Sequence, residues 1–126
     1  MDDQLLSTWE EVFKKGLLSF WILLLLNERE SYPFEMRDLI EEFSQGTISA
    51  DANSIYRALN RFEKVGLVSS KLTHSASGPD RRYYMLTTEG LCLLGHFIQR
   101  NLLVFQQADI VAHMQSVLEK LEKEGD

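Results

Sequence analysis

The chain has 126 residues, of which 44% are hydrophobic and 25% charged, and its formal net charge is −6 at pH 7. This length and balance predict one globular domain that can build a core without disulfides or metals. The single cysteine, Cys92, excludes an intrachain disulfide and a cysteine-based zinc site. Because no secretion signal is evident, we expect a cytoplasmic protein. Residues 17–26 form an apolar run that is about half as long as a membrane-spanning helix, so no membrane role is expected.

In the first segment the apolar side chains recur at steps of three and four, which predicts a helix whose second half is apolar nearly all round. Gly16 interrupts this pattern and indicates a bend or the junction of two helices. A second helix is predicted over residues 33–44, with Pro33 in its first turn and Gly46 just after its end. Its inner face is expected to carry Phe34, Met36, Leu39, Ile40 and Phe43.

A third helix is predicted over residues 52–65. Asp51 is its expected N-cap, with Ser49 as the alternative, and Gly66 closes it. Two helices joined by a short turn, the second of them polar and basic on its free face, are typical of a helix-turn-helix. The core face of the third helix comprises Ile55, Ala58, Leu59 and Phe62.

Two β-rich runs follow, at residues 67–73 and 82–86, and the sequence SASGP at residues 75–79 supplies a turn between them. Together they predict a two-stranded hairpin, or wing. Tyr83 and Tyr84 point to opposite faces of the hairpin, so we expect one of them in the core and the other at the surface.

The last helix is predicted over residues 89–122, with Thr87 or Thr88 as its cap. At about 1.5 Å per residue it would span roughly 50 Å, which is too long for the small body to cover. Its apolar stripe has near-heptad steps and slips near residues 106–109, where we expect an irregularity. An exposed stripe of this kind needs a partner, most simply a second copy of the chain. The stripe comprises Leu91, Leu94, Ile98, Leu102, Phe105, Ile110, Met114, Val117 and Leu121.

Charge is distributed unevenly along the chain. Residues 52–88 hold six Lys or Arg and two Asp or Glu, whereas the remainder holds seven basic and seventeen acidic residues. The acidic total argues mildly against nucleic-acid binding. Counter-ions screen charges beyond about 8–10 Å, however, so phosphates respond to the local basic patch.

Several segments of the chain form a specific combination of motifs. They are the first-helix run ending in LLLL, Tyr32, Phe34-Glu35, SIYRALNRFEKVGLV at residues 54–68, GPDRRYY at 78–84 and LTTEG at 86–90. Taken together, these segments resemble the PadR-type transcriptional regulators, over about residues 17–90. Two departures bear on fine DNA preference rather than on the fold: Pro33 stands where the family usually has glycine, and Asn53-Ser54 where it usually has Gly-Thr.

The resemblance implies a homodimeric repressor that binds double-stranded DNA and is released by a small hydrophobic or phenolic effector. The single C-terminal helix is similar to that of the smaller subfamily, in which it pairs with the partner's first helix. We expect a mainly α fold with a small β hairpin. Residues 1–88 would form a winged helix-turn-helix DNA-binding domain, with a recognition helix at 52–65 and a wing at 67–86, and residues 89–126 a dimerisation helix. Two recognition helices would read an inverted repeat.

On the third helix, Arg57, Asn60 and Arg61 are assigned to bases in the major groove, because arginine can bond guanine, and asparagine adenine, through two hydrogen bonds. In the alternative interpretation, Arg57 and Arg61 form surface pairs, and the Tyr56 ring packs under the wing. Phosphate contacts are expected from Asn53, Ser54, Tyr56 and Lys64.

On or near the wing, Lys71, His74, Arg81 and Arg82 are expected to contact the DNA backbone or the minor groove. In the alternative interpretation, Lys71 and Arg82 each form a solubilising cross-strand pair.

An effector pocket is expected where the first and last helices meet across a dimer, because aromatic rings suit flat apolar ligands. Ordinary dimer core is the alternative for the same residues. The candidates are Trp9, Phe13, Trp21, Phe97 and Phe105.

No metal, cofactor or catalytic role is expected. His96 and His113 lack ligand spacing, and the sequence contains no phosphate-binding glycine loop and no Ser-His-Asp or HExxH arrangement. Two competing hypotheses remain at this point: a winged-helix protein-interaction module that does not bind DNA, and a pure ligand sensor.

Overall fold

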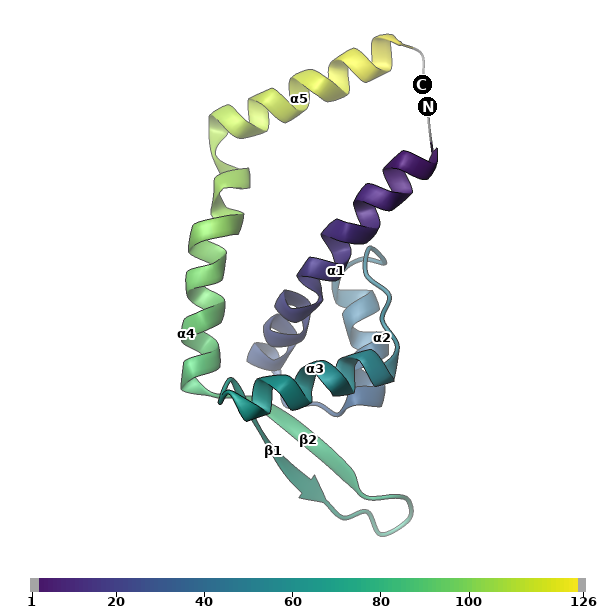
Figure 1. Cartoon of the computed structure of the whole chain (residues 1–126), viewed down its shortest axis with the longest axis vertical. Helices are drawn as coiled ribbons and strands as arrows, with labels where there is room; N and C mark the ends of the chain where they lie inside the picture. The colour runs from purple at the N-terminus through teal and green to yellow at the C-terminus, as the bar shows by residue number, and fades with distance from the viewer. Residues whose placement is uncertain (1–2, 125–126) are drawn as a thin grey trace. The chain divides into compact units, whose positions relative to one another are not determined.

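The computed structural model of the chain describes residues 3–124 and divides it into two compact units, Met1–Leu94 and Gly95–Asp126. The first unit contains α1 (Asp3–Glu28), α2 (Pro33–Phe43), α3 (Ala52–Lys64), β1 (Val68–Thr73), β2 (Arg81–Leu86) and most of α4 (Thr88–Phe97) (Figure 1). The second unit continues with a π-helical turn (Ile98–Leu102), a 3-10 turn (Leu103–Gln106) and α5 (Ala108–Lys123). The predicted fold class, mainly α with a winged helix-turn-helix and one hairpin, is confirmed.

Helix α1 runs without interruption through Gly16, so the predicted junction of two helices is wrong, whereas the alternative of a bend stays a prediction. One glycine inside a helix costs about 1 kcal/mol relative to alanine, which is too little to end a helix of 26 residues. As predicted, the apolar second half of α1 enters the core. Its buried residues are Ile22, Leu23, Leu25 and Leu26.

Helix α2 begins with Pro33 in its first turn, as predicted, and the chain leaves it through two left-handed residues, Gln45 (φ 56°) and Gly46 (φ 78°). Met36 and Ile40 are buried, but the prediction that Phe34 and Phe43 face inward is wrong, since their side chains are 60% and 43% exposed. The Arg37 guanidinium covers the Phe34 ring at 4.6 Å, and the Phe43 ring meets Trp21 edge-on. Both rings therefore pack against neighbours at the surface instead of entering the core.

Helix α3 packs its apolar face against the rest of the first unit, as its sequence pattern predicts. Ile55, Ala58 and Leu59 are buried, and Phe62 is half-buried. Because the core holds this face, the opposite face of α3 is left free.

Strands β1 and β2 form an antiparallel hairpin in which Lys71 lies opposite Tyr83 and Leu72 opposite Arg82. Tyr84 is fully buried and Tyr83 half-buried, so Tyr84 is the core member of the pair. Ser31, in the α1–α2 loop, pairs with Tyr84 from the other side of β2 through two backbone hydrogen bonds.

The C-terminal segment is not the single long helix that the sequence predicts. The irregularity expected at residues 106–109 is confirmed, because Gln107 is extended with ψ 141°, but a π-helical and a 3-10 turn precede it. Helix α5 carries no buried residue and exposes Val111, Met114, Val117, Leu118 and Leu121. Among residues 3–124, no helix is both long enough and apolar enough to span a bilayer.

Candidate nucleic-acid interface

Asp51 fixes the start of α3. Its side chain accepts a hydrogen bond from the Ser54 backbone N–H at 2.7 Å, which satisfies one of the free donors of the first turn. This hydrogen bond holds the pKa of the Asp51 carboxyl below its ordinary value of 3.8. Asp51, and not the alternative Ser49, is therefore the N-cap. At the other end, Gly66 takes a φ of 83° and lets the chain turn into β1.

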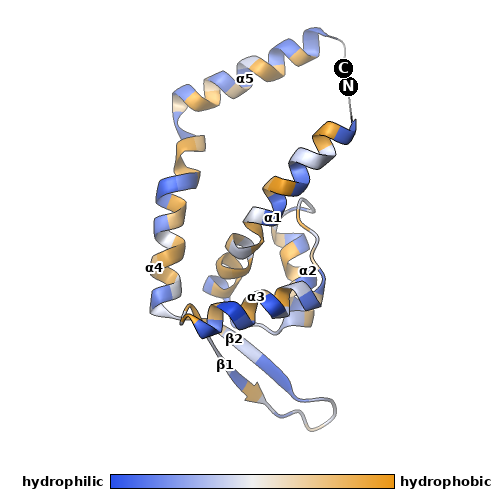
Figure 2. Cartoon of the chain, in the orientation of Figure 1, coloured by the Kyte–Doolittle hydropathy of each residue, from blue (hydrophilic) through white to orange (hydrophobic). Residues whose placement is uncertain are grey.

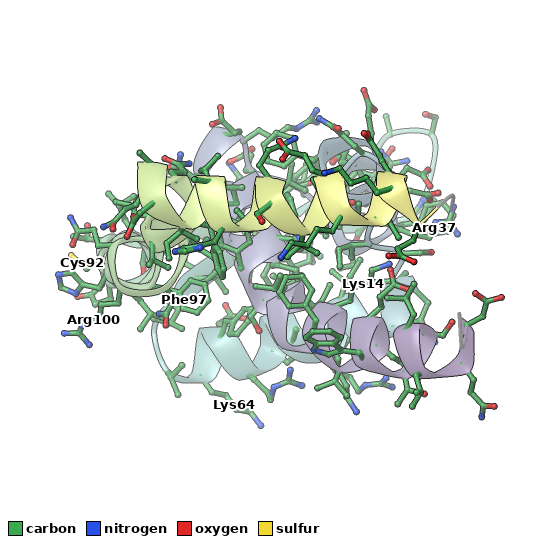
Figure 3. All side chains as sticks on the ribbon, turned by 90° about the horizontal axis from the view of Figure 1, so that it is seen from above. Lys14, Arg37, Lys64, Cys92, Phe97 and Arg100 are labelled. Atoms are coloured by element: carbon green, nitrogen blue, oxygen red, sulfur yellow. The ribbon has the colours of Figure 1, made fainter. Side chains whose placement is uncertain are left out.

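The face of α3 opposite the core is polar and cationic. Asn53, Arg57, Arg61 and Lys64 are exposed along it, at the steps of three and four that place side chains on one side of a helix. Figure 3 shows Lys64 projecting outward from this helix. Asn60 and Ser54, also predicted contacts, are half-buried. The structure thus brings the predicted helix residues together on one surface.

Two predicted contacts on α3 have specific neighbours. The Arg57 guanidinium donates to the Ser54 hydroxyl at 3.3 Å, and its charge also interacts with the Asp51 carboxylate at the start of the helix. Tyr56 is 47% exposed, so the alternative of a ring buried under the wing is wrong. Within the described residues, Arg61 and Lys64 have no ion pair, and the proposed surface pairing of Arg61 is not observed.

On the hairpin, by contrast, each predicted contact has a partner within the molecule. Lys71 Nζ lies 3.4 Å from Glu30, and His74 Nδ1 lies 2.9 Å from Asp80. The Arg81 guanidinium sits 4.6 Å from the centre of the Tyr32 ring.

Arg82 is tied to α3 through a relay. It donates to the Ser70 hydroxyl on the neighbouring strand at 3.1 Å, and that hydroxyl donates to Glu63 at 2.7 Å. The cross-strand alternative thus describes Arg82, although its partner is a serine, whereas the partner of Lys71 lies outside the hairpin.

Tyr84 lies behind this surface and fixes the hairpin to the core. Its ring is fully buried, and its hydroxyl makes no hydrogen bond with any described residue. Burial disfavours the phenolate and raises the Tyr84 pKa above its ordinary value of 10.0.

The aromatic residues predicted to line an effector pocket lie in different surroundings. Trp9 and Phe13 are 76% and 59% exposed on α1, and Phe105 is also exposed. Trp21 lies in the core region with its ring edge-on to Phe20 and Phe43, and Phe97 is half-buried. In the described residues, no group of three His, Cys, Asp or Glu side chains is arranged to hold a metal ion.

The sequence reasoning missed Glu30 and Tyr32, which touch two of the hairpin cations. Glu30 falls in a polar stretch that looks like a turn, and Tyr32 directly precedes the predicted second helix. A signal was present, because a residue before proline is driven toward extended backbone. Tyr32, before Pro33, has φ −113° and ψ 155°, and this extended segment is what pairs with β2.

A three-helix unit whose third helix presents a basic face, with an adjoining hairpin, defines a winged helix-turn-helix protein. A family model described as "Transcriptional regulator PadR-like family" matches residues 22–95. The chain belongs to this family of transcriptional regulators. A comparison with curated proteins finds no significant match.

Comparison with solved structures also finds transcriptional regulators. A transcriptional regulator from Clostridium thermocellum is 26% identical with a TM-score of 0.64, and the match covers 73% of this chain and 89% of that one. A PadR-like regulator from Bacillus cereus is 29% identical with a TM-score of 0.60, over 82% and 93% of the two chains. Bacillus subtilis PadR, solved in complex with operator DNA, is 24% identical with a TM-score of 0.62, over 68% of this chain and 48% of that one. At that identity the likeness to the Bacillus subtilis protein shows the fold.

Proposed function

We propose that this protein is a cytoplasmic, sequence-specific regulator that binds double-stranded DNA as a homodimer and represses transcription. The observation that carries the proposal is the free face of α3, where Arg57, Arg61 and Lys64 are exposed beside a hairpin with further cations. A helix with such a face fits the major groove, and its arginines have the geometry to read guanine. The hairpin cations suit the flanking phosphates.

The dimer is supported by exposed apolar side chains in both units. In the first unit, the N-terminal half of α1 exposes Leu6, Trp9, Val12 and Phe13, and in the second, α5 exposes a similar stripe. Figure 2 shows hydrophobic residues along both helices. Exposed apolar surface of this extent favours association, here with a second copy.

DNA selection tests the function. The full-length protein is incubated with a library of random duplexes, and bound fragments are recovered over several rounds. We expect enrichment of an inverted repeat with half-sites about 34 Å apart, one helical turn, because two α3 helices related by a two-fold axis would enter successive major grooves. If no sequence is enriched and duplexes of any sequence are not retained at low salt, the protein is instead an interaction module.

Sedimentation tests the dimer. We expect about twice the 14.6 kDa chain mass. Leu121→Lys, in the exposed stripe of α5, should shift the protein toward monomer, whereas Gln115→Lys on the same helix should not. A wild-type monomer at micromolar concentration would contradict the proposal.

We further propose that a small aromatic effector lowers DNA affinity, with Trp9, Phe13, Trp21, Phe97 and Phe105 as its contacts. Their aromatic character supports such a ligand. Titration with phenol or benzoate should quench tryptophan emission and weaken binding to the selected duplex. Quenching without any change in DNA affinity would contradict a regulatory role.

A further inference from the structure

The α1–α2 loop runs alongside the edge of β2 that β1 leaves free, and two of its side chains lie over one face of the hairpin. Residues opposite each other in an antiparallel pair share a face, and so do residues two apart on one strand. Lys71 lies opposite Tyr83, and Arg81 is two residues from Tyr83, so these three share a face. Glu30 and Tyr32, in the loop, contact this face: Glu30 reaches Lys71 at 3.4 Å, and the Tyr32 ring meets Tyr83 edge-on at 5.3 Å and lies against Arg81.

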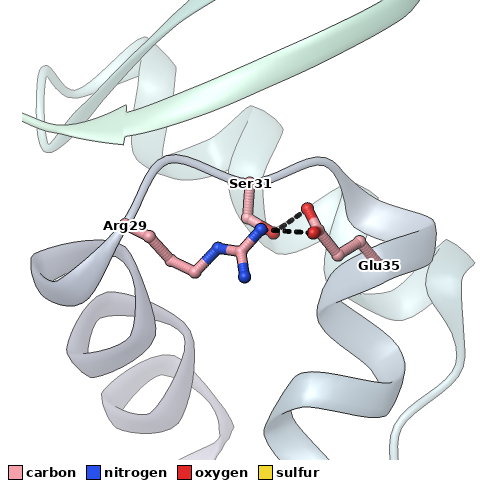
Figure 4. A network of polar contacts seen from close by, with 3 residues as sticks. All are labelled: Arg29, Ser31 and Glu35. Carbon is pink, nitrogen blue, oxygen red and sulfur yellow. Dashed lines mark hydrogen bonds and ion pairs between the residues drawn. The ribbon is translucent and has the colours of Figure 1, made fainter.

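The backbone of the loop is held in place between Glu30 and Tyr32. Ser31, between the two residues, is fully buried, and its backbone bonds to Tyr84 on both sides, at 2.8 and 3.2 Å. Its hydroxyl donates to Glu35 at 2.7 Å, and Arg29 forms an ion pair with the same carboxylate (Figure 4). The positions of Glu30 and Tyr32 against the hairpin are therefore set by the backbone on which they sit.

The two contacts have opposite effects on how available the cations are to a phosphate: one occupies Lys71, and the other orders Arg81. The Glu30 carboxylate neutralises Lys71 in the free protein and would repel an approaching phosphate. The Tyr32 ring leaves the charge of Arg81 intact while restricting the many rotamers of a free arginine side chain. Both side chains of the Lys71–Glu30 pair are exposed, and such a pair is weak enough for a phosphate to displace the carboxylate.

We propose that Glu30 and Tyr32 are positioning residues for the wing: Tyr32 presents Arg81 to the DNA backbone, and Glu30 competes with DNA for Lys71. This inference rests on the proposed DNA-binding function. It assigns the α1–α2 loop a part in setting affinity, with Glu30 lowering it and Tyr32 raising it, although neither residue is expected to touch DNA.

Glu30→Gln tests the competition. Affinity for the selected duplex should rise about three- to tenfold at low salt, and the dependence of log affinity on log salt should steepen by up to about 1, because Lys71 becomes free for one more phosphate. Glu28→Gln is the matched control. It removes the same charge from the last turn of α1, where the Glu28 side chain has no ion pair or hydrogen bond among the described residues. An equal gain in both variants would overturn the proposal.

Tyr32→Leu tests the support of Arg81. It should weaken binding to the duplex about three- to tenfold, whereas Tyr32→Phe, which keeps the ring, should bind like the wild type. Thermal melting by circular dichroism shows whether each variant is folded. If Tyr32→Leu is folded and binds as tightly as wild type, the inference is wrong.

An NMR measurement without DNA tests the contact between Tyr32 and Arg81 separately from DNA binding. Protons of a cation over an aromatic ring are shifted upfield in NMR spectra, so the Arg81 side-chain signals should be shifted in wild type and Tyr32→Phe and normal in Tyr32→Leu. Unshifted Arg81 signals in wild type would overturn the role of Tyr32. Failure of the wild type to bind any duplex would instead overturn the proposed function, and with it the competition by Glu30.

Discussion

The Thr87 hydroxyl donates a hydrogen bond to the Gly66 carbonyl oxygen at 2.6 Å. This contact ties the open end of the hairpin, where β1 begins and β2 ends, to the end of α3. The same hydroxyl accepts from the Gly90 N–H at 3.0 Å and so caps α4. The Thr87 backbone N–H also donates to the Leu67 carbonyl oxygen at 3.1 Å. One threonine thus joins α3, the start of β1 and the start of α4.

Gly90 is needed at this junction for its lack of a side chain. A Cβ there would lie 2.1 Å from the Leu67 carbonyl oxygen and 2.7 Å from Leu86 Cδ1. Gly90→Ala must push backbone apart, so we expect a loss of about 1–3 kcal/mol in the free energy of unfolding, measured by urea titration.

Gly16→Ala is the control for this substitution. Gly16 is also helical, and a Cβ there meets nothing within 4 Å. Alanine should therefore raise stability by about 0.5–1 kcal/mol, because it restricts the unfolded chain and favours helix. Equal stability of Gly90→Ala and wild type would show that the close approach to Leu67 is absent in solution.

Because the Tyr84 side chain is buried, we expect the protein to lose stability at alkaline pH. The unfolded chain releases the phenolic proton near the ordinary pKa of 10.0, whereas burial keeps the folded side chain protonated to higher pH. Above about pH 10 the unfolded state binds fewer protons than the folded state, so the free energy of unfolding falls as pH rises toward the raised pKa.

Tyr84→Phe should remove this part of the alkaline loss in urea titrations repeated across pH. At neutral pH its stability should lie within about 1 kcal/mol of wild type, because the hydroxyl it deletes has no hydrogen-bond partner among the described residues. An unchanged alkaline slope in Tyr84→Phe would contradict the assignment.

The winged helix-turn-helix could be predicted because local sequence signals determine it. Pro33 and Gly66 mark the start of one helix and the end of another, and the buried positions of α3 follow a helical period. The basic face of α3 could be predicted for the same reason, since the core fixes which side of an amphipathic helix is free.

The partners of Lys71 and Arg81, which lie in the α1–α2 loop, could not be predicted in this way. Glu30 and Lys71 are far apart in the sequence, and their contact depends on the pairing of Ser31 with Tyr84, which is a tertiary event. The exposure of Phe34 likewise depends on which side of α2 meets α1 and α3. Apolar character alone does not settle that choice when a neighbouring arginine can cover the ring.

Asp51 predicts an acid-sensitive start of α3. Its lowered pKa means that the charged carboxylate contributes stability above the ordinary value of 3.8, and that this contribution is lost as pH falls through the lower folded value. Asp51→Ala should lower the melting temperature at neutral pH, because it removes the acceptor for the Ser54 N–H.

Two further variants sharpen the Asp51 test. Asp51→Asn should retain most of the capping, and any difference from wild type should shrink on acidification, because asparagine has no charge to lose. Ser49→Ala should melt like wild type. If Ser49→Ala were the more damaging change, the cap would be assigned to the wrong residue.

The free face of α3 predicts two kinds of DNA-binding defect. Arg57→Ala should reduce affinity for the selected duplex by about 1–3 kcal/mol and relax the preference at one base step, because a bidentate base contact is lost. Lys64→Ala should weaken binding to all sequences alike and reduce the salt dependence by about 1, because a phosphate contact carries no sequence information. Gel shifts on the selected duplex and on a scrambled one, at several salt concentrations, separate the two.

Arg100→Ala is the matched control, since Arg100 is an exposed cation in the π-helical turn, outside α3 and the hairpin. It removes the same charge and should change affinity much less than either variant on α3. If Arg57→Ala and Lys64→Ala both bind the selected duplex like wild type, α3 does not present the DNA-binding face. If all three variants weaken binding equally and without regard to sequence, the effect is one of net charge, and the assignment of Arg57 to a base is wrong.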